Sequence, residues 1–192
     1  MAVFLLVPVN SMSNNLLIDP GLLFQKAQLQ RGMHVADFGT DRSGHLVFPA
    51  ALLLGEKGIM YAVDILKSIL ENVKKRADLE ALTNIHPIWS DLEKGKTAIP
   101  EKSLDVVFIV NTLSFCTQPD LILAEAKRLL RDKARLVIVD WREKVNSAMG
   151  PKDDMFIDFK KIKQWAKSEG FLVQEEFPVG HYHQGVVLFR HD

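Results

Sequence analysis

Hydrophobic residues recur along the chain in two alternating patterns. Short apolar runs that end near a glycine or an acid are typical of buried strands, whereas apolar residues at i, i+3, i+4 and i+7 are typical of helices. The runs predict strands at residues 34–38, 59–65, 85–89, 104–110, 135–140, 171–177 and 185–191. The helical spacing predicts helices at residues 16–29, 46–54, 66–82, 121–130 and 156–168.

This alternation is typical of a doubly wound α/β fold, in which helices connect the strands of a mostly parallel sheet. Asp19 followed by Pro20 marks a capped start for the first helix. Pro87 favours an edge position for the strand at 85–89, because proline cannot donate to a ladder. The segment 178–184 is too short for a crossover helix, so the last two strands should pair antiparallel. We therefore expect a parallel sheet with one reversed strand at its end.

The composition is that of an ordinary globular domain, with 192 residues of which 47% are hydrophobic and 25% charged. We expect an N-terminal arm and linker at 1–15 and a single domain at 16–192. The apolar start, residues 1–9, lacks the basic segment of a signal peptide and is too short to span a membrane. One cysteine, Cys116, forms neither an internal disulfide nor a thiolate metal cage, so we expect a cytoplasmic protein without a metal site.

Charge separates the classes of partner. Lys plus Arg and Asp plus Glu are both 24, so the formal net charge is zero. A protein that binds duplex nucleic acid usually carries a basic excess, which replaces counterions on the phosphates. The balance therefore disfavours nucleic acid and favours a small molecule as the partner. We expect the protein to be a monomer or a homodimer.

Polar residues leave the predicted strands at the edge where a doubly wound sheet binds ligands. Asp37 and Gly39 end the first strand, and the turn that follows reaches Gly44 before a helix, which allows close approach of backbone to a ligand. Asp64 ends the second strand, where a carboxylate can accept hydrogen bonds from ribose hydroxyls. Asp91 follows the third strand. Each acid alone is better explained as a cap or turn residue than as a ligand; together they outline a site for an adenine nucleoside.

Several segments match the successive motifs of one enzyme family. These segments are Asp37-Phe38-Gly39 with Gly44, residues 55–58, Tyr61-Ala62-Val63-Asp64, Asp91-Leu92, residues 104–107, residues 124–130 and residues 136–141. In them the chain resembles class I S-adenosylmethionine-dependent methyltransferases, and especially the small single-domain enzymes of the quinone-biosynthesis type. The resemblance runs from about Leu16 to the C-terminus.

The resemblance implies a Rossmann-like sheet of seven strands with the last strand antiparallel, and S-adenosylmethionine as the cofactor. In the family, the residues at these positions surround the methionine part, hold the ribose, pack on the adenine or accept from its amino group, and lie near the transferred methyl. The cofactor-binding residues implied here are Asp37, Gly39, Arg42, Gly44, Asp64, Ile65, Asp91, Leu92 and Asn111.

Two glycine-rich turns of the family are altered. The middle glycine of the first motif is missing, and the loop Thr40–Ser43 is one residue longer than usual. Arg42 could pair with the carboxylate of the cofactor, or Asp41 and Arg42 could pair with each other and fill the pocket. Before the fifth strand, residues 131–134 replace a Pro-Gly-Gly turn. We expect this second change to have a small cost in stability.

The sequence therefore predicts methyl transfer from S-adenosylmethionine to a small molecule. The candidates for a general base are Asp140, His181 and His183, and for each histidine a structural role is as well supported. One alternative is a catalytically degenerate protein that keeps the fold as a binding or regulatory module. Another is a nicotinamide-dinucleotide protein, which the spacing of Gly39 and Gly44 disfavours.

Overall fold

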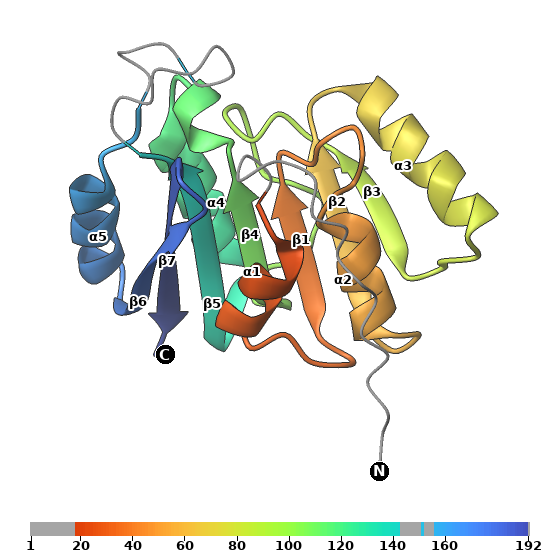
Figure 1. The fold of residues 1–192 in the computed structure, drawn as a ribbon, viewed down its shortest axis with the longest axis horizontal. Helices are drawn as coiled ribbons and strands as arrows, with labels where there is room; N and C mark the ends of the chain where they lie inside the picture. The colour runs from red at the N-terminus through yellow and green to blue at the C-terminus, as the bar shows by residue number, and fades with distance from the viewer. Residues whose placement is uncertain (1–17, 143–150, 152–155, 192) are drawn as a thin grey trace.

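Seven strands form one sheet in the order β3-β2-β1-β4-β5-β7-β6 (Figure 1). The structure is a computed structural model that describes residues 18–142, 151 and 156–191. The strands are β1 (His34–Phe38), β2 (Ile59–Asp64), β3 (Ile85–Trp89), β4 (Leu104–Val110), β5 (Leu130–Trp141), β6 (Phe171–Val179) and β7 (His183–Arg190). β7 pairs antiparallel with both β5 and β6, and the other pairs are parallel. The expected fold class, a doubly wound α/β sheet with its last strand reversed, is confirmed.

Helices cover both faces of this sheet and give the molecule three layers (Figure 1). The helical elements are α1 (Pro20–Lys26), α2 (Val47–Leu54), α3 (Lys67–Leu79), the 3₁₀ turn η1 (Leu113–Phe115), α4 (Pro119–Leu129) and α5 (Phe159–Ser168). Along β4, Val106 and Phe108 pack in the core under α1, α2 and α3, while Val107 and Ile109 pack in the core under α4 and α5. Both faces of β4 are therefore buried, which explains its continuous apolar sequence.

Carboxylates hold the starts of three helices. Asp19 accepts a hydrogen bond from Gly21 N at 2.8 Å at the start of α1, with Pro20 in the first turn. Asp64 Oδ1 accepts from Leu66 N at 2.7 Å ahead of α3, and Asp158 Oδ1 accepts from Lys160 N at 2.8 Å in α5. Because Asp64 is also a predicted ligand residue, the start of α3 fixes the direction of a side chain in the candidate site.

The sheet reverses its order of strands between β1 and β4. From β1 the chain winds outward through β2 to β3, and it then returns to place β4 on the other side of β1. The segments that follow β1 and β4 therefore run in opposite directions, and a crevice opens between them at the carboxyl ends of the two strands. This switch point is where a ligand of a doubly wound sheet is expected.

The structure corrects several predicted boundaries. α1 ends at Lys26 rather than residue 29, α4 runs from Pro119 to Leu129, and α5 starts at Phe159 because Asp158 is its N-cap. The reversed strand β7 lies between β5 and β6, so the sheet ends in β6 and not in the reversed strand. Strand β3 lies at the opposite edge, as Pro87 predicted. The predicted arm at 1–15 lies outside the described residues.

The prediction of a turn at residues 131–134 is wrong, because β5 begins directly after α4 at Leu130. The pairing with β4 shifts register between Leu104 and Val106, so these residues form an irregular stretch of strand. Lys133 there has φ of +62°, a left-handed conformation that favours glycine. The backbone thus keeps a conformation that suits glycine although the residue is lysine.

We expect Lys133→Gly to raise the free energy of unfolding by up to about 1 kcal/mol, because glycine adopts positive φ without the strain of a Cβ. Urea unfolding at neutral pH measures the change. Lys133→Ala is the matched control: it removes the same side chain but keeps the Cβ, so it should give no gain. Equal stability of the two variants would contradict the assignment of strain to this residue.

Candidate active site

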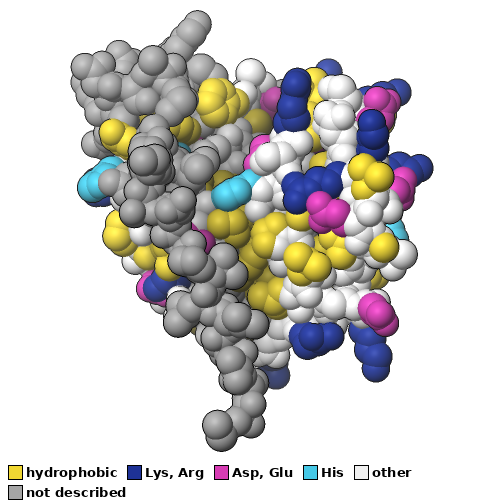
Figure 2. All heavy atoms as spheres, turned by 45° about the vertical axis from the view of Figure 1, so that its right-hand side comes forward, with side chains coloured by type: hydrophobic (Ala, Val, Ile, Leu, Met, Phe, Trp, Pro, Cys, Tyr) yellow, Lys and Arg dark blue, Asp and Glu magenta, His cyan; other side chains and the backbone are white. Residues whose placement is uncertain are grey.

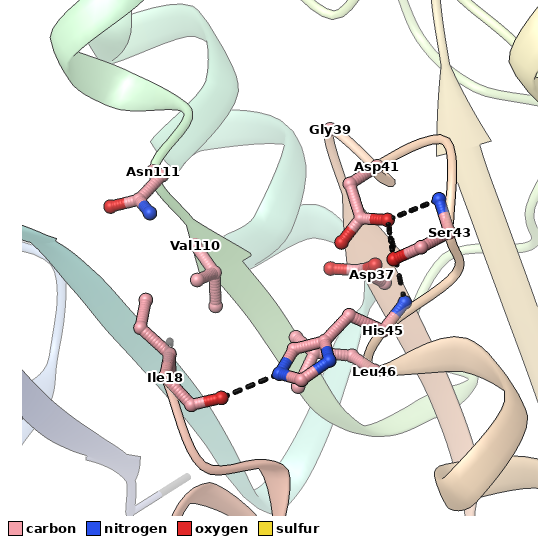
Figure 3. A pocket seen from close by; sticks show the side chains of 9 residues that line it. All are labelled: Ile18, Asp37, Gly39, Asp41, Ser43, His45, Leu46, Val110 and Asn111. Carbon is pink, nitrogen blue, oxygen red and sulfur yellow. Dashed lines mark hydrogen bonds between the residues drawn. The ribbon is translucent and has the colours of Figure 1, made fainter. Parts of the chain in front are cut away.

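A cavity of about 260 Å³ lies at the switch point, between the ends of β1 and β4 (Figure 3). Its lining residues come from the segment before α1, from the end of β1 and the loop after it, and from the end of β4. They are Ile18, Asp37, Gly39, Asp41, Ser43, His45, Leu46, Val110 and Asn111. Three of the predicted site residues, Asp37, Gly39 and Asn111, therefore share one cavity. The other six lining residues, Ile18, Asp41, Ser43, His45, Leu46 and Val110, were not among the predicted site residues.

Asp37 is the most deeply buried acid of this cavity, with 4% of its surface exposed. Its Oδ2 accepts a hydrogen bond from Thr40 Oγ1 at 2.6 Å. Burial is the main cause that raises the pKa of Asp37 to about 7; the hydrogen bond from Thr40 opposes the rise, and the nearby charges of Asp41 and Asp64 add to it. A buried carboxyl that ionises near neutral pH next to a cavity is typical of a functional site.

Gly39 permits the close approach of β1 and β4. Its φ is +82°, and a Cβ on this residue would overlap the Thr112 side chain. Thr112 Oγ1 donates to Phe38 O at 2.9 Å, which ties the segment after β4 to the end of β1. Asn111 is also left-handed, with φ of +51°, and its buried Oδ1 has no hydrogen-bond partner among the described residues. The end of β4 thus holds a buried oxygen without a partner in the described ranges, on a residue that lines the cavity.

The altered loop Thr40–Ser43 leaves the cavity open. Asp41 Oδ1 accepts hydrogen bonds from Ser43 N at 2.5 Å and His45 N at 3.4 Å, and also from Ser43 Oγ (Figure 3). Arg42 is exposed and lies outside the lining of the cavity. Asp41 and Arg42 form no ion pair within the described part of the chain. The loop therefore folds on its own backbone and does not fill the crevice.

Gly44 and the rim of β2 lie next to this cavity. Gly44 has φ of +62°, and a Cβ there would come within 2.5 Å of the Phe48 ring. Gly39 N donates to Val63 O at 2.9 Å, which places Gly39 beside the end of β2 and so beside Asp64. Burial raises the pKa of Asp64. Asp64, Gly39 and Asp37 thus form one continuous edge.

The end of β3 continues the same edge. Asp64 pairs with Trp89 in register, and Asp91 follows two residues later. Trp89 Nε1 donates to Ile65 O at 2.9 Å, so the two exposed apolar residues Ile65 and Trp89 are held together. Asp91 Oδ1 accepts from Glu93 N at 3.1 Å and Oδ2 pairs with Lys94 at 3.1 Å, while Leu92 is buried beneath. An apolar surface between two carboxylates therefore lies along the rim.

Several buried polar atoms near the ends of β4 and β5 have no hydrogen-bond partner in the described part of the chain. Within the described residues, the buried side-chain atoms without a hydrogen-bond partner are Asn111 Oδ1, Ser114 Oγ, Trp141 Nε1 and His183 Nε2. The Trp141 and His183 rings pack at 4.4 Å between centroids. Unpaired buried polar atoms are costly, and their concentration at one edge of a sheet is typical of a ligand site.

The three candidates for a general base lie in different surroundings. Asp140 is fully buried, its oxygens accept from Ser114 N at 3.2 Å and Trp141 N at 2.8 Å, and burial raises its pKa. His183 is buried, and burial lowers its pKa to about 4, so its ring is neutral at pH 7. His181 is exposed in the turn before β7. Their catalytic roles stay predictions.

Cys116 has the properties of a structural thiol. Its Sγ donates to Thr112 O at 3.1 Å, and burial raises its pKa to about 12. The thiol is therefore protonated at neutral pH and is a poor nucleophile. Among the described residues, no cluster of three or more His, Cys, Asp or Glu side chains is arranged to hold a metal ion. No helix in the described ranges has the length and apolar character needed to cross a bilayer.

Comparison with known proteins identifies the class. The methyltransferase domain family matches residues 29–177, so the chain belongs to this family. In solved structures, a SAM-dependent methyltransferase from Aquifex aeolicus has a TM-score of 0.79 and 25% identity, with 90% of each chain covered. The family expected from the sequence motifs is confirmed.

Two curated relatives match over a smaller share of the chain. The chain is 32% identical over 96 residues to aklanonic acid methyltransferase DauC from Streptomyces sp. (strain C5), and this match covers 50% of the chain and 41% of that relative. It is 27% identical over 165 residues to a probable cobalt-precorrin-6B C(15)-methyltransferase (decarboxylating) from Sulfurisphaera tokodaii, with 82% of each protein covered. The chain thus spans less than half the length of the first of these relatives.

Proposed function

We propose that this protein transfers the methyl group of S-adenosylmethionine to a small-molecule acceptor. The observation that carries the proposal is the cavity at the β1–β4 switch point, where Asp37, Asp41 and Asn111 present oxygen atoms. A ligand with positive charge suits such a lining, and the methionine part of this cofactor carries a sulfonium and an ammonium group. Membership of the methyltransferase domain family supports the same assignment.

The residues along the rim fit the rest of the cofactor. Asp64 would accept from the ribose hydroxyls, the exposed side chains of Ile65 and Trp89 offer an apolar surface for the adenine, and Asp91 would accept from its amino group. Gly39 and Gly44, at the two ends of the loop near the methionine part, both have positive φ and carry no Cβ there. The bound cofactor supplies an electrophilic methyl group, and the chain supplies its position.

A small, mainly uncharged acceptor is supported by three features. Trp141 Nε1 and His183 Nε2 are buried polar atoms that an acceptor with hydroxyl or carbonyl groups could satisfy. The curated relatives are named for aklanonic acid and cobalt-precorrin-6B, which are small molecules. On the described face in Figure 2, basic and acidic side chains are mixed with hydrophobic ones, which suits nucleic acid poorly.

Methyl transfer depends mainly on holding the acceptor in line with the sulfonium, and a base is needed only when the acceptor atom carries a proton. We place the acceptor beside the unpaired polar atoms near the ends of β4 and β5. Asp140 accepts a hydrogen bond from Ser114 N there, and the His183 ring packs against Trp141. His183, neutral at pH 7, is suited to accept or donate one hydrogen bond to the acceptor. We propose a positioning role for it.

Isothermal titration with S-adenosylmethionine tests the cofactor assignment. We expect saturable heat, and a protein stabilised by about 2.7 kcal/mol when the ligand is at 100 times its dissociation constant. Asp64→Asn, whose side-chain oxygen can still accept from Leu66 N ahead of α3, should weaken binding by removing the ribose carboxylate. ATP and NAD serve as ligand controls, since they share the adenosine but carry negative charge. Absence of heat and of thermal shift with S-adenosylmethionine at millimolar concentration would refute the proposal.

A further inference from the structure

The loop after β1 places a second carboxylate at the cofactor cavity. Asp41 lies in the segment where the family's first motif carries glycine, and it lines the cavity together with Asp37. Its Oδ1 is held by Ser43 N and His45 N. In Figure 3 the other oxygen lies toward Asp37 and the open space. The charge of Asp41 is also one of the causes that raise the pKa of Asp37.

The other polar groups of the lining do not neutralise this charge. His45 Nε2 is 2.5 Å from Ile18 O, so it is occupied by a backbone carbonyl. Ser43 Oγ donates to Asp41 itself. The neighbouring cation, Arg42, is exposed and lies outside the lining. Asp37 and Asp41 therefore give the cavity an excess of negative charge, and Asn111 Oδ1 adds a third oxygen without a partner.

Such a cavity distinguishes a charged ligand from a neutral one of nearly the same shape. S-adenosylmethionine carries a positive sulfur, and when the S–CH₃ bond breaks its electron pair remains on the sulfur, which leaves neutral S-adenosylhomocysteine. Resting on the proposed function, we propose that Asp41 makes the cavity selective for S-adenosylmethionine over S-adenosylhomocysteine. The attraction between Asp41 and the sulfonium exists only before methyl transfer, whereas any attraction to the ammonium group is common to both ligands, so the same carboxylate promotes release of the product.

Asp41→Asn tests this by calorimetry with both ligands. Asparagine keeps the oxygen that accepts from Ser43 N and His45 N, so the loop and the start of α2 are preserved. We expect the ratio of the two affinities to fall by about three- to tenfold, through weaker binding of S-adenosylmethionine. Raising the salt concentration should reduce the ratio in the unmodified protein more than in the variant.

Glu56→Gln is the matched control, because it removes one negative charge from an exposed turn before the amino end of β2, whereas the cavity lies at the carboxyl ends of the strands. It should leave the ratio unchanged. If Asp41→Asn weakens both ligands equally, or neither, selectivity does not come from Asp41 and the inference is overturned. If the unmodified protein binds neither ligand, the proposed function itself fails, which is a separate result.

Discussion

Gly39→Ala is expected to lower the free energy of unfolding by about 2–4 kcal/mol and to abolish measurable binding of S-adenosylmethionine. Two costs add at this position. The residue has φ of +82°, which an alanine adopts only with strain, and its new Cβ would overlap Thr112. Relief requires β1 and β4 to separate at the cavity that they form. Urea unfolding measures the first effect and calorimetry the second.

The double variant Gly39→Ala/Thr112→Ala separates the two costs. Thr112→Ala alone should cost about 1 kcal/mol, since it removes the hydrogen bond from Thr112 Oγ1 to Phe38 O. In that background the two shortest contacts are gone and only the Cβ of residue 112 remains, at 3.1 Å, so the added cost of Gly39→Ala should drop to about 1–2 kcal/mol, mainly the strain of positive φ. Strictly additive effects would show that contact with Thr112 is not what requires glycine.

The edge of the sheet that carries the site was predictable because it follows from strand order and from residues at strand ends. Asp37, Asp64 and Asp91 each follow a recognisable strand, and parallel strands bring their carboxyl ends together. The altered loop was not predictable in the same way. Whether Asp41 and Arg42 closed the pocket depended on the hydrogen bonds of Asp41 to its own loop, which the sequence does not determine.

Residues that reach the site from distant elements were missed for a related reason. Ile18 lies before α1 and lines the cavity, and its carbonyl contacts His45, a pairing across 27 positions. No periodicity marks such a contact. The register of β5 was missed because Arg131, Asp132 and Lys133 read as a polar turn, although Arg131 forms an ion pair with Asp105 at the start of β4. Tertiary pairing overrode the local signal there.

Asp37→Asn is expected to stabilise the protein at pH 8 while removing most of its affinity for S-adenosylmethionine. The pKa of Asp37 is raised to about 7 by burial, so the folded state retains a proton that the unfolded chain releases near pH 4. Stability from this group is complete below pH 4, falls as pH rises toward 7, and is lost above 7. The shift corresponds to at most about 4 kcal/mol, because one pKa unit is about 1.4 kcal/mol.

Asparagine cannot ionise, so the difference in stability between the variant and the unmodified protein should grow from near zero at pH 4 to its maximum at pH 8. Thr40 Oγ1 can still donate to the asparagine oxygen, which keeps the end of β1 in place. Comparing the two proteins at each pH cancels the opposite effect of His183, whose lowered pKa destabilises the fold as pH falls toward 4. A difference that does not change with pH would contradict the raised pKa of Asp37.

Ligand binding should lower the pKa of the Asp37 carboxyl, which burial raises in the protein without ligand. A cationic ligand favours ionised Asp37, so affinity for S-adenosylmethionine should increase from pH 6 to pH 8 and binding at pH 7 should release a proton. Titrations in buffers of different ionisation enthalpy measure that release. His45→Gln serves as a control, because His45 also faces the cavity and carries an ionisable ring. Loss of the pH dependence in Asp37→Asn but not in His45→Gln would assign it to Asp37, whose burial destabilises the empty fold in order to bind a cation.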